Sequence, residues 1–183
     1  MRNVEFKAEL RDPQVARAVA RSIGGKLVGT IEQTDTYYRV LTGRLKKREA
    51  VVDGEAEPVE YIHYERDNRT LPRISSFQIL SEAEFRERFG TLPLPEWLTV
   101  RKQREVYLVG HARIHLDRVE HLGSFIEFEA LVTRDHNVAR AHETVAKLRA
   151  DFGPVMGEAL SGSYSDLLAQ HAETPDPLAG SGS

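Results

Sequence analysis

Charged residues recur at intervals of two within short segments of this chain that have the composition of β-strands. The sets are Glu5/Lys7, Arg44/Lys46/Arg48, Lys102/Arg104, Arg113/Asp117 and Glu127/Glu129, and Arg66 lies in a further segment of this kind. Successive side chains of a strand point to opposite faces, so each set lines one face, and the residues between them are mostly apolar. Buried charges are tolerated only where partners or a charged ligand offset them. The pattern predicts barrel strands whose charged face encloses water, metal and an anionic ligand.

The acidic members of these sets are candidate metal ligands. Glu5 lies near the start of the chain, and Glu127 and Glu129 lie far along it. Carboxylate oxygens, together with phosphate oxygens of a substrate, are the ligands that Mg²⁺ and Mn²⁺ prefer. The three residues therefore predict a site for one or two divalent ions. The alternative is that each glutamate pairs with a lysine or arginine on a neighbouring strand.

The basic members are candidate phosphate ligands. Arg44, Lys46 and Arg48 would form one row, in which guanidinium groups bind phosphate oxygens in pairs and lysine adds a compact charge. The sets at Lys102/Arg104 and at Arg113 suggest convergence on one chain of phosphates. The alternative is a solvated or nucleic-acid-binding patch. Because the formal net charge is only −3, we expect no nucleic-acid partner.

Turn and capping signals divide the chain into alternating strands and helices. A helix is expected after Asp12-Pro13 and up to Gly24-Gly25, a second over 81–89 behind a Ser81/Glu84 capping box, and a third from Asp135 to Asp151. Strands are expected near residues 4–10, 26–32, 34–41, 43–50, 60–68, 99–109, 112–119 and 124–133. The strands predict an antiparallel sheet that closes around the charged face.

Length and composition favour one soluble domain. We expect a single domain over residues 1–172 and a tail over 173–183 that is disordered, or in part a remnant of expression, because it is rich in Pro, Gly and Ser. The chain has no cysteine, no apolar run near the roughly 18 residues of a membrane span, and no signal-like segment at its start. The expected location is cytoplasmic, without a membrane partner.

Several motifs together resemble the CYTH superfamily, the triphosphate tunnel metalloenzymes, and within it the class IV adenylyl cyclase-like branch. They cover most of residues 1–170. The motifs are Asn3-Val-Glu5-Phe-Lys7, Asp35-Thr-Tyr37, Gly43-Arg44-Leu-Lys46-x-Arg48-Glu49, Tyr61-Ile-x-Tyr64-x-Arg66, Lys102-x-Arg104, Leu116-Asp117-x-Val119, Leu122-Gly123-x-Phe125-Ile-Glu127-Phe-Glu129 and Ser163-Tyr-Ser-Asp-Leu-Leu168.

This resemblance implies an α+β fold, a closed eight-stranded antiparallel β-barrel (the triphosphate tunnel) with flanking helices. It also implies a site with three groups of residues. Catalytic roles would fall to Asp117, Lys7 and Arg113; phosphates would contact Lys7, Arg44, Lys46, Arg48, Arg66, Lys102, Arg104 and Arg113; and Mg²⁺ or Mn²⁺ would be held by Glu5, Glu127 and Glu129. The family motif Glu-x-Glu-x-Lys has Asn3 at its first position here, which removes a charge from the metal site.

Three functions remain open from the sequence. The first is a metal-dependent adenylyl cyclase-like enzyme that converts ATP to cyclic AMP and pyrophosphate. The second is a triphosphatase acting on inorganic triphosphate or an organic one such as thiamine triphosphate. The third is a nucleotide or polyphosphate sensor without turnover. The expected partner is a small-molecule triphosphate, and a homodimer is compatible with the resemblance. His111 and His115 lack the spacing of a helical zinc motif, and His115 is expected to be structural.

Overall fold

The computed structural model describes residues 1–173, and the tail predicted for 173–183 lies outside them except for its first residue. Glu173, the first residue of that predicted tail, is the last residue of a helix. None of the helices in the described range is long and apolar enough to cross a membrane.

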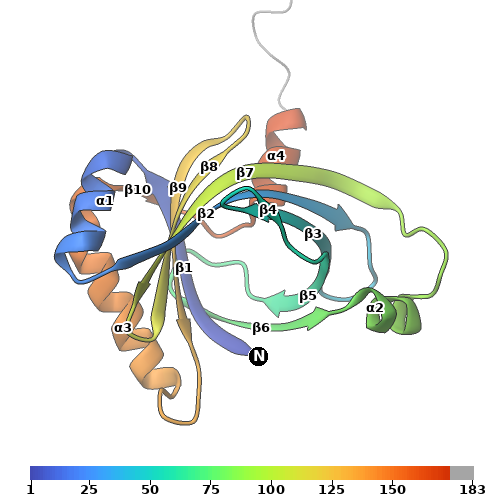
Figure 1. Cartoon of the computed structure of the whole chain (residues 1–183), viewed down its shortest axis with the longest axis horizontal. Helices are drawn as coiled ribbons and strands as arrows, with labels where there is room; N and C mark the ends of the chain where they lie inside the picture. The colour runs from blue at the N-terminus through green and yellow to red at the C-terminus, as the bar shows by residue number, and fades with distance from the viewer. Residues whose placement is uncertain (174–183) are drawn as a thin grey trace, which may run out of the picture.

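Eight antiparallel strands form a closed barrel, which confirms the predicted fold class (Figure 1). Around the barrel they follow the order β1-β6-β5-β3-β2-β7-β8-β9, and pairing of β9 with β1 closes it. Their bounds are β1 Arg2–Leu10, β2 Lys26–Tyr38, β3 Arg44–Val52, β5 Glu60–Arg66, β6 Arg73–Leu80, β7 Glu96–Val109, β8 Ala112–Val119 and β9 Gly123–Leu131. Two short strands extend the sheet: β4 (Glu55–Ala56) pairs with β3, and β10 (Met156–Ala159) pairs with β1.

The helices flank the barrel and start at side chains that cap them. They are α1 Pro13–Ser22, α2 Glu82–Phe89, α3 Val138–Asp151 and α4 Tyr164–Glu173, with a single 3₁₀ turn, η1, over Gly153–Val155. Asp12 accepts hydrogen bonds from two backbone N–H groups of α1, and the predicted Ser81/Glu84 capping box is present at α2. The predicted start of the third helix is wrong by a few residues. Asn137, not Asp135, is its N-cap and accepts from the Arg140 N–H.

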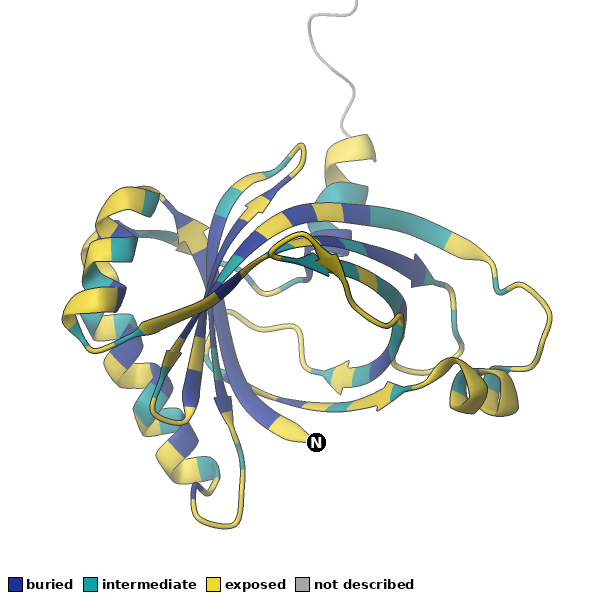
Figure 2. Ribbon diagram, in the orientation of Figure 1, coloured by how far each residue is buried: buried dark blue, intermediate teal, exposed yellow. Residues whose placement is uncertain are grey.

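The apolar core lies between one side of the barrel and the helices α1 and α3. The outward faces of β1, β8 and β9 pack against these helices, and the core includes Ala16 of α1 and Leu148 of α3. Its fully buried strand residues include Val4, Ile114, Ile126 and Phe128. Because the inward faces of the same strands are also buried, nearly every residue of β1 and β9 is shielded from water (Figure 2).

The sequence interpretation missed five elements: β4, β6, η1, β10 and α4. β6 was not predicted because its inward positions include small Ser75 while Ile74 points outward and is exposed, so the usual apolar alternation is absent. β10 and α4 follow the turn at Gly153-Pro154, where the prediction ended. The strands predicted over 26–32 and 34–41 form one strand, β2, because Gln33 points into the barrel and pairs with Asp35 instead of breaking the ladder.

Candidate active site in the barrel interior

The barrel encloses a cavity lined by most of the residues predicted from the sequence. Its free volume, with the solvent-filled open end included, is about 810 Å³. The predicted residues that line it are Glu5, Lys7, Lys46, Arg48, Arg66, Lys102, Arg104, Arg113, Glu127 and Glu129. Arg44 and Asp117 do not line this cavity.

Strand register explains why residues distant in sequence meet. In the β1–β9 pair, Glu5 lies opposite Glu129 and Lys7 lies opposite Glu127. In the β8–β9 pair, Arg113 lies opposite Glu129. Directly opposed residues project from the same face of the sheet, so the closing strand pair brings the two acidic segments together.

The interior carries more positive than negative charge. The cavity wall and the side chains directly behind it hold eight basic and five acidic residues, an excess of three positive charges when every lysine is protonated. The basic residues are Lys7, Lys46, Arg48, Arg66, Arg73, Lys102, Arg104 and Arg113, and the acidic ones are Glu5, Asp35, Asp117, Glu127 and Glu129. Uncompensated charge in an enclosed space is costly, so this interior favours an anionic ligand.

Asp35 organises the basic residues on β2, β3 and β7. Its carboxylate lies 2.7 Å from Lys46 Nζ, 3.0 Å from Arg48 Nε and 3.6 Å from Lys102 Nζ, and Gln33 donates to it. Burial alone would raise the pKa of this carboxyl, but the charges of Arg48, Lys46 and Lys102 hold it well below its usual value. Asp35 was part of a motif of the resemblance but had no predicted role. It lies two residues before Tyr37 on β2, so both side chains project into the barrel.

The two lysines around Asp35 lose protons unusually easily. Burial, with repulsion from Arg48, lowers the pKa of Lys46 to about 7 despite the attraction of Asp35. Burial, with repulsion from Arg104, lowers the pKa of Lys102 to about 8. Both ammonium groups would be stabilised by a negatively charged ligand placed against them.

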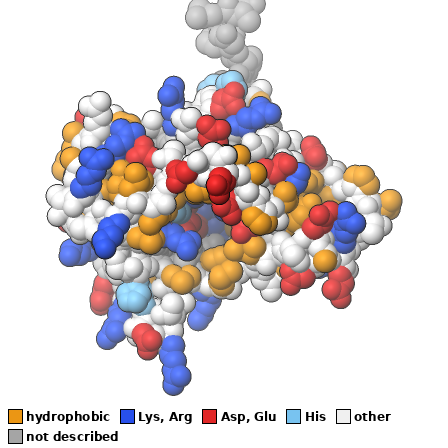
Figure 3. Space-filling model, in the orientation of Figure 1, with side chains coloured by type: hydrophobic (Ala, Val, Ile, Leu, Met, Phe, Trp, Pro, Cys, Tyr) orange, Lys and Arg blue, Asp and Glu red, His pale blue; other side chains and the backbone are white. Residues whose placement is uncertain are grey.

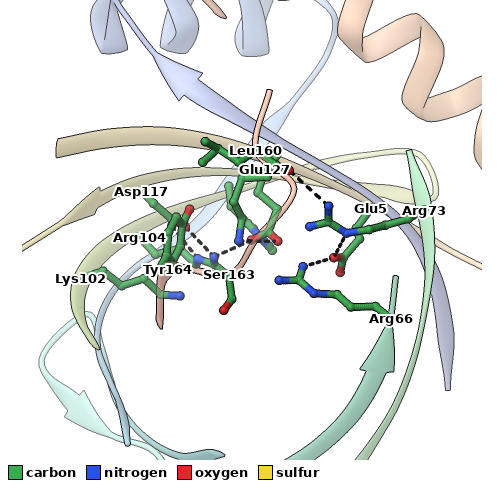
Figure 4. Close-up of polar contacts among 12 residues, drawn as sticks. Glu5, Arg66, Arg73, Lys102, Arg104, Asp117, Glu127, Leu160, Ser163 and Tyr164 are labelled. Carbon is green, nitrogen blue, oxygen red and sulfur yellow. Dashed lines mark hydrogen bonds and ion pairs between the residues drawn. The ribbon is translucent and has the colours of Figure 1, made fainter. Parts of the chain in front are cut away.

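Glu127 and Glu5 are held by basic neighbours (Figure 4). Glu127 lies 3.3 Å from Lys7 Nζ and 2.8 Å from Arg104 Nη2, and His115 Nδ1 lies 3.5 Å away. Glu5 accepts hydrogen bonds from Arg66 and Arg73. Burial would raise the pKa of the Glu127 carboxyl, but Lys7 and the hydrogen bond from His115 hold it well below its usual value. Of the three predicted metal ligands, Glu5 and Glu127 are therefore ion-paired.

Arg73, which the sequence interpretation missed, ties β6 to the segment before α4. Besides Glu5, its guanidinium donates to the carbonyl oxygens of Leu160 and Ser161, and its side chain is fully buried. It lies in the unpredicted strand, so no sequence pattern placed it on the inward face.

Asp117 is engaged by two neighbours and positions Arg104. Its two oxygens accept from Arg104 Nε and Nη2 at 2.6 Å each, and the Tyr164 hydroxyl donates to it at 2.7 Å. Despite burial, the charges of Arg104 and Lys102 lower its pKa well below the usual value. Arg113, which shares a face of β8 with Asp117, is not its partner, because the register places Arg104 on β7 opposite Asp117.

The helix α4 closes one end of the barrel. The Tyr164 ring lies beneath Lys7 Nζ, 3.9 Å from the ring centre, and packs against Phe125. Arg44, predicted to bind phosphate, instead donates to Asp166 and Ser163 at the start of α4. The resemblance had marked this segment as a motif, but its sequence gave no sign that Tyr164 enters the barrel.

The residues present fit a divalent cation. Glu127, Glu129 and His115 offer ligand atoms that all lie within 4.8 Å of one another. Asn3 Oδ1 is buried without a hydrogen-bond partner in the described chain, and Asn3 and Glu129 line the same cavity wall. An unsatisfied amide oxygen and a carboxylate without an ion-pair partner in residues 1–173 are suitable ligands for Mg²⁺ or Mn²⁺.

Arg113 is the least restrained of the basic residues in the cavity. It is exposed at the open end, and within residues 1–173 no hydrogen bond or ion pair engages its guanidinium. It lies opposite Glu129 on one side and Leu108 on the other. Its charge is therefore available to an incoming anion.

Comparison with known proteins agrees with this architecture. The family model of the CYTH domain matches residues 1–164. The chain belongs to the CYTH domain family. This confirms the family predicted from the motifs, a family of enzymes that act on triphosphates. A search of curated protein sequences finds no significant match.

Solved structures share the CYTH fold over nearly the whole chain. PH1819 from Pyrococcus horikoshii superimposes with a TM-score of 0.70 at 25% identity, covering 92% of this chain and 99% of that one. A candidate adenylate cyclase from Vibrio parahaemolyticus gives 0.64 at 14% identity, with 91% and 97% covered. A candidate adenylyl cyclase from Hippeastrum, described as having a dominant triphosphatase activity, gives 0.56 at 13% identity, with 97% and 99% covered.

Proposed function

We propose that this chain is a divalent-metal-dependent enzyme that cleaves a triphosphate bound inside the barrel. The observation that carries the proposal is the excess of three positive charges in an enclosed interior that also presents Glu129 and Asn3 Oδ1 as free metal ligands. Fold alone does not decide function, whereas this combination of basic residues and oxygen ligands is the chemistry that phosphoryl transfer needs.

Each group of residues has a distinct role in the proposal. Lys46, Lys102 and Arg48, held together by Asp35, bind phosphate oxygens. Asp117 keeps the Arg104 guanidinium in one orientation, which avoids reorganisation when charge develops on the phosphoryl group. Lys7, predicted to act directly in catalysis, is shared between Glu127 and the Tyr164 ring. A bound Mg²⁺ or Mn²⁺ would be held by Glu129 and Glu127 with Asn3 and His115 nearby, and would offset charge on phosphoryl oxygens.

The first candidate reaction is cyclisation, as in an adenylyl cyclase. The 3′-hydroxyl oxygen of ATP would bond to the α-phosphorus, the bond to the bridging oxygen would break, and pyrophosphate would leave as the hydroxyl loses its proton. The distribution of charge supports this assignment. Asn3, Glu129 and Arg113 lie toward the open end, and the lysines around Asp35 lie deeper, where they would retain pyrophosphate.

The second candidate is hydrolysis of the terminal phosphate. Asp117, predicted to orient or deprotonate a hydroxyl nucleophile, accepts from Arg104 and Tyr164 and has a depressed pKa, so it is a weak base. The activity described for the Hippeastrum protein is in line with this candidate. A sensor that binds without turnover is the third reading, motivated by Asn3 in place of a carboxylate.

One screen separates these candidates. The protein is incubated with ATP, GTP, thiamine triphosphate or inorganic triphosphate in Mg²⁺ or Mn²⁺, and products are followed by phosphorus NMR. Cyclic nucleotide with pyrophosphate identifies a cyclase, orthophosphate identifies a triphosphatase, and binding without turnover identifies a sensor. Binding should also depend on phosphate number, since each added phosphate meets further basic groups. Equal affinity for AMP and ATP would contradict the proposal.

A further inference from the structure

The open end of the barrel is apolar, unlike the interior. Along β7 the inward positions change from Lys102 and Arg104 to Val106 and Leu108. The same change, in the same direction along the barrel, occurs on β3 and β2. On β3, Lys46 and Arg48 give way to Val52, and on β2, Asp35 and Gln33 give way to Ile31 and Val28.

We name this end the apolar rim and define it by Val28, Ile31, Val52, Val106, Leu108 and, across the opening, Ile79. Strand positions that face a cavity are normally shielded, but Val28 is 51% exposed, Ile79 42% and Leu108 41%. Figure 3 shows a hollow on this face with hydrophobic side chains at its border and basic side chains within it. The opposite end differs, because Tyr164, Phe125 and the other apolar residues around α4 close it.

The apolar rim and the charged interior form one continuous binding space. The cavity bounded by Val28, Val106 and Leu108 also touches Arg104, Arg113 and Glu129, which line the central cavity as well. A molecule that enters here therefore meets the apolar rim together with Arg113 and Glu129, which lie beside Leu108 in the sheet, and then the lysines around Asp35. Inorganic triphosphate would leave the rim in contact with water, whereas an organic ester would cover it.

We propose that the apolar rim binds the organic group of a triphosphate ester, an aromatic and largely uncharged group such as a nucleobase. The α-phosphate then lies beside Arg113 and Glu129, and the terminal phosphate points toward Lys46 and Lys102. This inference rests on the proposed function and specifies its substrate as an organic triphosphate entering phosphates first. It also places the α-phosphorus, not the terminal one, next to the oxygen ligands of a metal.

The test compares organic and inorganic triphosphates on matched variants. Val28→Ser and Leu108→Ser are combined to make the rim polar. The controls are Leu27→Ser and Ile74→Ser, whose side chains are 50% and 37% exposed and line none of the described cavities. Affinities for ATP, GTP, thiamine triphosphate and inorganic triphosphate are measured by calorimetry in EDTA, so that no turnover occurs. The oligomeric state of each variant is determined by light scattering.

The expected result is that at least one organic triphosphate binds the wild type more tightly than inorganic triphosphate does. The rim variant should lose about tenfold in affinity for that ester, the effect of losing a modest apolar contact. Its affinity for inorganic triphosphate should change less than about twofold, and the controls should change neither value.

Three results would overturn the inference. If inorganic triphosphate binds as well as every ester, the rim has no ligand, although the proposed function stands. If the rim variant loses both kinds of ligand equally, the substitutions act on the channel itself. If the wild type is a dimer that the rim variant breaks while ATP affinity is unchanged, the rim is an interface between copies. Failure of all triphosphates to bind would instead refute the proposed function.

Discussion

Two halves of the barrel wall differ in what covers their outer face. β1, β8 and β9 are covered on the outside by α1 and α3 and on the inside by the charged cavity, so both faces are shielded. β5 and β6 have no such cover over most of their outer face (Figure 2), and at the start of β6, from Arg73 to Ser76, buried residues alternate with exposed ones. The apolar area that can stabilise the fold is thus concentrated behind the half that presents Glu5, Asp117, Glu127 and Glu129.

Because of this difference, residues on the outer face of a helix-backed strand determine the stability of the fold, and residues on its inner face determine binding. The helix-backed half can hold carboxylates and arginines at fixed positions because its other face is an apolar core, whereas the open half supplies cavity residues from strands with less support. Substitutions in the core behind β9 should therefore affect folding, and substitutions one residue away on its inner face should affect ligand and metal binding.

The largest expected effect is on the core face of β9. Phe128 is fully buried and packs against Phe6 and Phe152. Phe128→Ala should lower the free energy of unfolding by about 3–5 kcal/mol, the range for truncating a buried phenylalanine. Urea denaturation measures this change. Ile74→Ser on the uncovered half is the control and should change it by less than about 0.5 kcal/mol; similar losses for both variants would contradict the comparison.

The next effect concerns the neighbouring inward residue, Glu129. Glu129→Gln keeps the shape but removes a charge that no group in residues 1–173 offsets. We expect metal affinity, measured by Mn²⁺ titration, to fall about 100-fold with a matching loss of metal-dependent turnover. The free energy of unfolding should stay within about 0.5 kcal/mol of the wild type. Survival of both metal affinity and turnover would show that Glu129 is not a metal ligand.

A smaller effect is the pH dependence of binding at Lys46 on β3 and Lys102 on β7, which lie outside the helix-backed half. In the free protein the pKa is about 7 for Lys46 and about 8 for Lys102, and a bound triphosphate raises both. Binding therefore takes up protons, so affinity is highest below pH 7, falls by up to about tenfold per pH unit between pH 7 and 8, and by up to about 100-fold per unit above pH 8, where both lysines are deprotonated in the free protein. Calorimetry without metal, in buffers of different ionisation enthalpy, measures the uptake.

Two checks sharpen this prediction. Lys102→Arg, which stays charged, should flatten the upper part of the pH profile. The free protein should behave oppositely. Because the unfolded chain keeps these lysines protonated up to about pH 10, it binds more protons than the folded one, and the free energy of unfolding rises as pH increases from 7 to 9. Affinity independent of pH would rule out titrating lysines in the site.

The smallest effect is at the closed end. Tyr164→Phe removes the hydrogen bond to Asp117 but keeps the ring beneath Lys7. The free energy of unfolding should fall by about 1.5 kcal/mol, the lower end of the range for a hydrogen bond to a charged group, because the ring is retained. Tyr38→Phe is the control, because the Tyr38 hydroxyl has no hydrogen bond in the described chain. Equal responses of the two variants would mean that the contact to Asp117 contributes nothing.

The sequence predicted the barrel and most of its lining because both depend on a local rule. Alternation along a strand places Lys46 and Arg48, or Glu127 and Glu129, on one face whatever the partner strand is. It could not predict partners, which depend on register. Asp117 faces Arg104 and not Arg113 because β7 and β8 are aligned in that way. Arg44 is likewise in phase, but α4 arrives from the far end of the chain and binds it.

Other site residues were not predicted because no sequence pattern marks them. Arg73 lies on a strand with no clean alternation, and Tyr164 lies on a helix whose docking is not encoded in its own sequence. The apolar rim could have been read from Val106, Leu108 and Val52, which continue the charged series on their strands. These apolar residues occupy the inward positions that follow the last charged residue of each strand.

The pairing of β1 with β9 constrains the order in which the barrel can fold. β1 is synthesised first, yet its partners β6 and β9 lie roughly 70 and 120 residues later, so its ladder consists of long-range contacts. Such contacts are slow to form, because the entropy cost of closing a long loop comes before any stabilising hydrogen bond is made. Until residues 123–131 arrive, Glu5 and Lys7 remain hydrated on an open edge. Ring closure is then the step that removes water from the interior charges, at the moment when their partners come into register.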